Sequence, residues 1–236
     1  MKKIINRQEK MFFASCIERL ERGSATNFLD PRKVMILLQM CKKRNIPCYL
    51  FQPFTEAEKT VLYTNDPMVS CIKVTAKEKV THSQVLGTLF SHQTEPEMYG
   101  DIVVINNVVY LWIVQSCLRY FEQYFTHIGK IPVEIEQKPV DVIVDYEPKK
   151  IKETYLTSSL RLDAVVATIT GLSRKKVLEL FEQRYIIYQY QEANRGTLEM
   201  EEGAIFSIRK YGKYQLQSIV GKSKKGKYIL EIAKYQ

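Results

Sequence analysis

Apolar residues recur every three or four positions in several segments, the spacing that places them on one face of a helix. The clearest stripe runs over residues 162–169 and ends at Gly171, and a second follows over residues 177–181. The sequence therefore predicts two short helices joined by a corner of two or three residues. The apolar members of the two stripes are Leu162, Val165, Val166, Ile169, Val177, Leu180 and Phe181. Further helices are expected over residues 30–44, 56–62, 81–91 and 116–129.

Runs rich in β-branched and aromatic residues predict the strands. A hairpin is expected over residues 101–114, where Asn106 and Asn107 suit a turn with positive φ. A second hairpin is expected around KSKKGK (222–227), a polar turn that contains glycine. The strands predicted from these runs are 46–54, 69–74, 101–105, 108–114, 131–136, 185–190, 204–211, 215–220 and 227–235.

This order of elements divides the chain into an N-terminal α/β segment (1–67), a middle domain (68–147), a linker (148–157) and a C-terminal module (158–236). The middle domain has the order β-α-β-β-α-β, the layout of the ferredoxin-like sandwich and of RNA-recognition (RRM) domains. No glycine-and-aromatic RNA-binding consensus lies on its third strand. Tyr110 and Trp112 share one face of that strand and could stack on bases, but packing against a helix or another domain is the favoured interpretation.

The composition indicates a folded chain, since 45% of its 236 residues are hydrophobic. No apolar run reaches the length of a membrane span, and the N-terminal apolar stretch is too short for a secretory signal, so we expect a soluble cytoplasmic protein. The five cysteines stand in neither CxxC pairs nor zinc-ligand spacing, which favours reduced thiols. Three histidines leave little material for metal or acid–base chemistry, and we expect neither a metal nor a cofactor.

The formal net charge of +9 points to an acidic partner, most often a nucleic acid. Residues 151–236 carry 15 Lys and Arg against 9 Asp and Glu, whereas residues 1–150 carry 20 against 17. The basic excess is therefore concentrated in the C-terminal module. Arg161 at the start of its first helix and Arg184 near the end of its second would extend a basic surface.

Three cations stand at the start of the second helix of this module. Ser173 is a typical N-cap residue, so Arg174, Lys175 and Lys176 fall in the first turn. That end of a helix already carries about half a positive charge, and cations there are unfavourable. An RNA phosphate would meet unpaired N–H groups and the favourable end of the dipole. The placement favours a phosphate site over the alternative, an ordinary solvated charge run.

A similar conflict occurs in the N-terminal segment. Asp30 and Pro31 suit the N-cap and first positions of a helix, but Arg32 is again a cation in the first turn. A carboxylate partner within the protein is the favoured explanation for Arg32, with RNA contact as the alternative.

The stretches SSLRLDAVVA (158–167), LSRKKVLELF (172–181) and GAIFSIRKYGKY (203–214) resemble the S4 RNA-binding domain, also called the αL motif, whose two helices form the RNA-facing surface. Two departures affect the strand register: Ala204 stands where the domain has aspartate, and its usual glycine and Val-Asn after the second helix are replaced. The resemblance implies that the RNA-contacting residues include Arg161, Asp163, Ser173, Arg174, Lys175, Arg209, Lys210 and Lys213.

The stretches ATNFLDPRKVMIL (25–37), EAEK (56–59), VLGTLFSHQTEPEMYGDIVV (85–104) and HIGKIPVEIE (127–136) are similar to the YlmH family. This resemblance implies an α+β fold of three small modules: an N-terminal α/β segment, an RRM-like middle domain and a C-terminal S4 domain. It further implies a bacterial ribosome-associated factor that binds obstructed large subunits carrying peptidyl-tRNA, in ribosome-associated quality control. The expected partners are rRNA, tRNA and the large ribosomal subunit, with no membrane, and the free protein is expected to be a monomer.

Two other functions remain open. An RNA-modifying enzyme with an S4 appendage is disfavoured, because the chain has no GxxxxGK[ST], GxGxxG or HExxH motif and no match to a catalytic synthase domain. We therefore expect no enzymatic activity. An interaction scaffold, for instance in cell division, would leave the basic face without a role.

Overall fold

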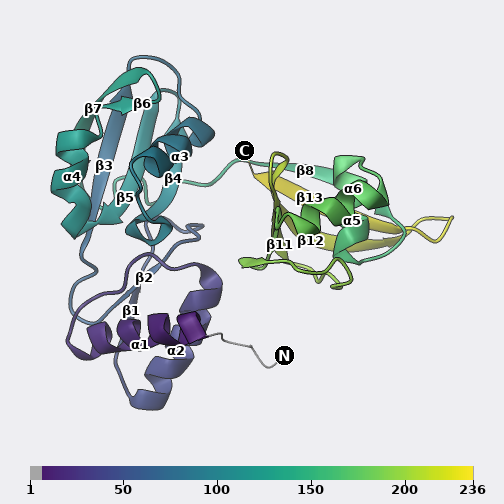
Figure 1. Cartoon of the computed structure of the whole chain (residues 1–236), viewed down its shortest axis with the longest axis horizontal. Coiled ribbons are helices and arrows are strands. Elements are labelled where there is room, and N and C mark those ends of the chain that lie inside the picture. The colour runs from purple at the N-terminus through teal and green to yellow at the C-terminus, as the bar shows by residue number, and fades with distance from the viewer. Residues whose placement is uncertain (1–6, 236) are drawn as a thin grey trace. The chain divides into compact units, whose positions relative to one another are not determined.

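The structure, a computed structural model, describes residues 7–235. These residues form two compact units, one that extends to Glu147 and one that begins at Pro148. Both are mixed α/β units built on antiparallel sheets (Figure 1). Among the described helices, none is both long enough and apolar enough to cross a bilayer.

The N-terminal segment contains two helices and a small antiparallel sheet: α1 (Arg7–Glu21), α2 (Pro31–Arg44), β1 (Tyr49–Phe51) and β2 (Val61–Tyr63). The predicted start of α2 is confirmed, because the side chain of Asp30 accepts the backbone N–H of Lys33 at 2.9 Å. Helix α1 was not predicted. Its buried residues do follow helical spacing, and they pack against α2: Phe13, Cys16, Ile17 and Leu20.

The prediction of a helix over residues 56–62 is wrong. Glu58 and Lys59 both donate their backbone N–H to one carboxylate oxygen of Asp101, at 3.1 and 2.9 Å. The backbone of Thr60 forms a bridge with Leu29, and β2 follows directly. Distant segments thus take the backbone hydrogen bonds that a helix would have needed.

The middle domain has the predicted β-α-β-β-α-β order, with one short extra strand, β6. Its elements are β3 (Val69–Ala76), α3 (His82–Ser91), β4 (Tyr99–Ile105), β5 (Val108–Val114), α4 (Leu118–Tyr124), β6 (His127–Ile128) and β7 (Ile131–Lys138), with single 3₁₀ turns at Pro96–Met98 and Gln115–Cys117. The strands lie in the order β4-β5-β3-β7-β6.

Local signals set most of the boundaries of this domain. Thr81 caps α3 in a reciprocal capping box with Gln84. Asn106 adopts φ +58° in the hairpin turn, as predicted. The expected end of α4 at Gly129 is wrong: α4 ends at Tyr124 and the chain joins the sheet, so Gly129 (φ +61°) makes the β6–β7 turn instead.

Each face of the middle sheet is covered. Helices α3 and α4 pack on one face through a core that includes Val85, Leu89, Phe121 and Phe125. The N-terminal segment packs on the other face through Phe28, Phe54 and Val61, against Cys71, Val103 and Trp112 of the sheet. The N-terminal segment and the middle domain, predicted as separate modules, therefore share a core within one compact unit.

The C-terminal unit is a six-stranded antiparallel sheet with two helices packed on one face (Figure 1). Its elements are β8 (Lys150–Thr157), α5 (Leu162–Thr170), α6 (Arg174–Glu182), β9 (Ile186–Tyr188), β10 (Gln191–Glu192), β11 (Ile205–Ile208), β12 (Gly212–Lys222) and β13 (Tyr228–Tyr235). The strand order is β10-β9-β11-β12-β13-β8.

The prediction of a linker over residues 148–157 is wrong. Strand β8 occupies most of it and pairs with β13 over eight residues. It is an edge strand, and most of its residues are exposed. Its side chains therefore lack the alternation of polar and apolar residues that identifies a half-buried strand.

Candidate nucleic-acid interface

The α5–α6 corner has the predicted geometry. Helix α5 begins after Arg161 and ends at Gly171, whose φ of +69° suits glycine at a left-handed C-cap. Helix α6 begins two residues later with Ser173 as its N-cap, whose side chain accepts the backbone N–H of Lys176 at 3.5 Å. The apolar stripes of both helices point into one core, so their polar faces remain outside.

The three cations at the start of α6 are exposed. Within residues 7–235, no acidic side chain forms an ion pair with Arg174, Lys175 or Lys176. Their positive charge adds to that of the helix N-terminus without compensation from the protein. The arrangement is electrostatically unfavourable by itself and becomes favourable when an anion binds there.

Arg32 provides the contrast, because it is also a cation in the first turn of a helix. Its guanidinium forms a two-bond ion pair with Glu9, at 2.6 Å (Nη1–Oε1) and 3.3 Å (Nη2–Oε2). Both side chains are largely buried, with exposed fractions of 10% and 22%. The predicted carboxylate partner of Arg32 is thus confirmed. The protein neutralises the misplaced cation in α2 but not those in α6.

A cavity of about 560 Å³ lies between the two helices of the corner. Arg161 and Arg174 contribute cations to its lining, and Asp163 contributes the carboxylate that holds Arg161, with Nη2–Oδ2 at 2.5 Å and Nε–Oδ1 at 3.1 Å. The other lining residues are small or apolar: Ser158, Ser159, Ala164, Ala167, Thr168, Val177 and Leu178. The guanidinium of Arg161 is therefore held in place at the edge of a recess, next to the start of α6.

The remaining predicted residues lie away from this cavity. Arg184 follows α6 and forms an exposed ion pair with Glu192 at 3.5 Å. Arg209 lies over the ring of Tyr185 at 4.6 Å, and its backbone N–H donates to the Tyr185 carbonyl, which places it near Arg184. Lys210 is exposed in the turn before β12.

Lys213 lies on strand β12, and its side chain points away from the helices. The next residue, Tyr214, is buried in the core beneath α5 and α6, and successive strand residues point to opposite faces. The Lys213 ammonium lies 5.1 Å from the ring of Tyr235 and 5.7 Å from that of Tyr190. Burial lowers its pKa to about 8. The predicted set thus divides: Arg161, Asp163, Ser173 and the three α6 cations gather at the corner, and the other four lie elsewhere.

The sheet of the middle domain cannot use Trp112 to stack on bases. Trp112 is fully buried, its ring lies 5.7 Å from that of Phe54, and its Nε1–H donates to the Val140 carbonyl at 2.8 Å. The expectation that this face packs against another part of the protein is confirmed. Tyr110, on the same strand face, packs against the same cluster.

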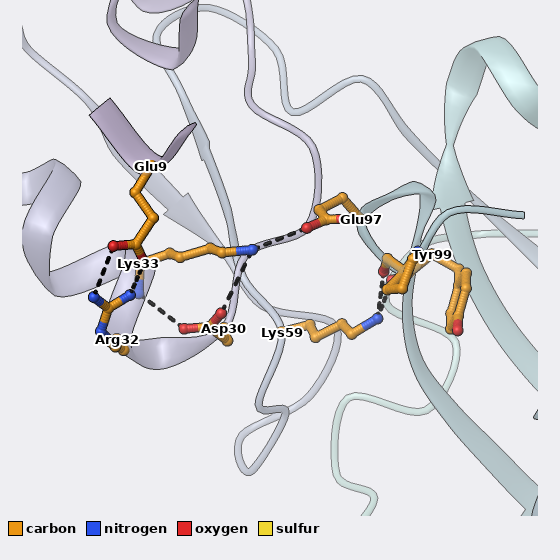
Figure 2. A network of polar contacts seen from close by, with 8 residues as sticks. Glu9, Asp30, Arg32, Lys33, Lys59, Glu97 and Tyr99 are labelled. Carbon is orange, nitrogen blue, oxygen red and sulfur yellow. Dashed lines mark hydrogen bonds and ion pairs between the residues drawn. The ribbon is translucent and has the colours of Figure 1, made fainter. Parts of the chain in front are cut away.

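A polar network also joins the N-terminal segment to the middle domain (Figure 2). The Lys33 ammonium lies 2.9 Å from Glu97 and 3.8 Å from Asp30. Lys59 donates to the carbonyls of Pro96 and Tyr99, at 2.6 and 2.8 Å, and burial lowers its pKa to about 8. Both cations have partners within the protein, which indicates a structural joint. Sequence patterns did not reveal this network, because its paired residues are far apart in the sequence: Lys33 and Glu97 are separated by 64 positions.

These features define a mixed α/β protein with an exposed corner at which the three cations of α6 have no ion-pair partner among residues 7–235. Residues 68–142 match the family model described as "Putative RNA-binding domain in YlmH", so the middle of the chain is similar to that class of domain.

The resemblance to the YlmH family is confirmed. The chain is 26% identical over 225 residues to the "Ribosome-associated protein quality control protein P2" of Bacillus subtilis (strain 168), an alignment that spans 90% of this chain and 87% of the relative. It is also similar to a solved structure, "Cell division protein ylmH from Streptococcus pneumoniae", with 21% identity and a TM-score of 0.49, over 61% of this chain and 99% of that one.

Proposed function

We propose that this protein is a non-catalytic RNA-binding factor that associates with the bacterial ribosome in the cytoplasm. It acts on large subunits that are obstructed by peptidyl-tRNA, as part of ribosome-associated quality control, and it contacts rRNA and tRNA. The name of the Bacillus subtilis relative and the RNA-binding family model support the ribosomal and RNA-binding parts of the proposal.

The observation that carries the proposal is the α5–α6 corner. Arg174, Lys175 and Lys176 place unpaired charge at a helix N-terminus, beside a cavity edge where Asp163 orients Arg161. In our proposal the C-terminal unit is an S4 domain, and this corner receives the phosphate backbone of the RNA. Backbone N–H groups and cations would then contact adjacent phosphates, so recognition depends on shape and charge more than on base edges.

The proposal is tested by co-sedimentation of the full-length protein with large ribosomal subunits that do or do not carry peptidyl-tRNA. The test variant is R174Q/K175Q, and the control is K42Q/K43Q, an adjacent pair of exposed lysines at the end of α2 with the same loss of charge. We expect wild type and control to sediment preferentially with the peptidyl-tRNA-bearing subunits and the test variant to remain largely in the supernatant. Equal sedimentation of all three proteins would contradict the proposal and favour an interaction scaffold.

A further inference from the structure

The hairpin formed by β12 and β13 extends beyond the rest of the C-terminal unit (Figure 1). Its last strand pair is Lys222 with Tyr228, and residues 223–227 form the tip. Ser223 closes the turn: its backbone N–H donates to the Lys227 carbonyl at 2.7 Å, and its hydroxyl accepts the Lys227 N–H at 3.2 Å. Gly226, at φ +75°, completes it. The tip is therefore a defined turn.

The tip concentrates positive charge. Three of its five residues, Lys224, Lys225 and Lys227, are lysines, and Lys222 directly precedes it; all four lysines are exposed. Within the part of the chain that the structure describes, no carboxylate forms an ion pair with Lys224, Lys225 or Lys227. Two acids contact the hairpin further from the tip and make other bonds: Glu231 of β13 accepts the Ser218 hydroxyl, and Glu202, which precedes β11, accepts the Ile219 N–H.

The hairpin lies at the same end of its sheet as the α5–α6 corner. Tyr228 pairs with Thr157 of β8, and the next residues, Ser158 and Ser159, line the cavity that also contains Arg161. At about 3.3 Å per strand residue, the tip extends roughly 10 Å beyond the Tyr228–Thr157 pair. A rigid RNA that lies on the corner would therefore also reach the tip.

Lysines on a strand edge often serve only to prevent edge-to-edge pairing. That explanation does not account for Lys224 and Lys225, because they lie in the turn, outside the paired strands. The tip also offers no free aromatic ring for base stacking, since Lys222 lies over the ring of Tyr228 at 4.6 Å. A tip with ammonium groups and no stacking surface is suited to phosphates rather than to unpaired bases.

We propose that the β12–β13 tip is a second phosphate-binding element, so that the C-terminal unit holds the backbone of double-stranded RNA at two points, the tip and the α5–α6 corner. This inference rests on the proposed RNA-binding function and adds both a second contact and a preference for duplex RNA.

The test uses full-length protein and two fluorescently labelled probes, a short RNA duplex and a single strand of the same length, titrated by fluorescence anisotropy at several salt concentrations. The test variant is K224Q/K225Q, and the control is K42Q/K43Q. Two lost phosphate contacts lower the slope of log affinity against log salt by about 1.8 on the duplex. Between about 50 and 200 mM salt, wild type should then lose roughly tenfold more affinity for the duplex than K224Q/K225Q loses. The control should match wild type.

Wild-type affinity and salt slope in K224Q/K225Q on the duplex would overturn this inference. An equal loss in K42Q/K43Q, or an equal loss on the duplex and the single strand, would overturn it as well. These results leave the proposed function intact, because R174Q/K175Q tests it separately. Conversely, loss in K224Q/K225Q together with wild-type binding by R174Q/K175Q would support the hairpin contact and contradict the proposed role of the corner.

Discussion

Phe54 is one of the residues through which the N-terminal segment covers the sheet of the middle domain. Its side chain is 3% exposed, its ring lies 5.7 Å from that of Trp112, and it meets Tyr146 edge-on at 5.3 Å. Replacement by alanine should therefore open a cavity at the centre of this shared core and leave the sheet hydrogen bonds in place.

The expected cost follows from the buried area and the ring contacts. A buried aromatic side chain removes about 150–250 Å² from water, which is worth roughly 4–6 kcal/mol at 25 cal/mol per Å². Phe-to-Ala substitutions in protein cores typically cost about 3–5 kcal/mol. In a unit of this size, a loss of about 4 kcal/mol lowers the midpoint of thermal unfolding by roughly 8–16 °C.

The fluorescence of Trp112 is a suitable assay, because Trp112 is the only tryptophan of the chain and lies in this core. Urea unfolding followed by its emission should show a free energy of unfolding about 3–5 kcal/mol lower for F54A than for wild type. The control is F90A, since Phe90 is 62% exposed on α3 and should change stability by less than about 0.5 kcal/mol. If F54A were no less stable than F90A, the N-terminal segment would not cover the sheet as described.

Two further predictions concern buried charges. The variant R32Q should lose about 1–3 kcal/mol of unfolding free energy, because the largely buried two-bond ion pair between Arg32 and Glu9 is lost. The variant R22Q should lose little, since the Arg22–Glu18 pair is exposed. Urea unfolding of both variants checks this, and similar losses would contradict it. Burial raises the pKa of Asp101 from 3.8 to about 6, so the stability from its protonation is fully present below pH 3.8 and is lost as the pH rises through about 6. Wild type should therefore gain about 2–3 kcal/mol relative to D101N as the pH falls from about 7 to about 4, and a constant difference across this range would contradict the assignment.

The sequence predicted the features that depend on neighbouring residues. Asp30, Thr81 and Ser173 cap the helices they were expected to cap, and Gly171 ends α5, because a cap depends on residues within one turn of the helix. The exposed cations of α6 were found for the same reason, as a conflict with the dipole of their own helix.

The errors share a different cause. Strand β8 exists because β13 supplies its hydrogen bonds, and residues 58–60 are not helical because Asp101 and Leu29 bind their backbone groups. In each case the partners, β13 for β8 and Asp101 and Leu29 for residues 58–60, are distant in the sequence. The predicted RNA-contacting residues divide between the corner and other parts of the C-terminal unit, and Lys213 lies on the opposite sheet face. This division likewise depends on strand pairing.

The most direct test of the central claim is the salt dependence of RNA affinity for R174Q/K175Q. Fluorescence anisotropy with a labelled RNA duplex should give a slope of log affinity against log salt that is lower than that of wild type by about 1.8, with K42Q/K43Q unchanged. Affinity should fall to a similar extent on duplexes of different sequence, because phosphate contacts carry no sequence information. A variant with the wild-type slope and affinity would show that the cations of α6 do not bind RNA phosphate.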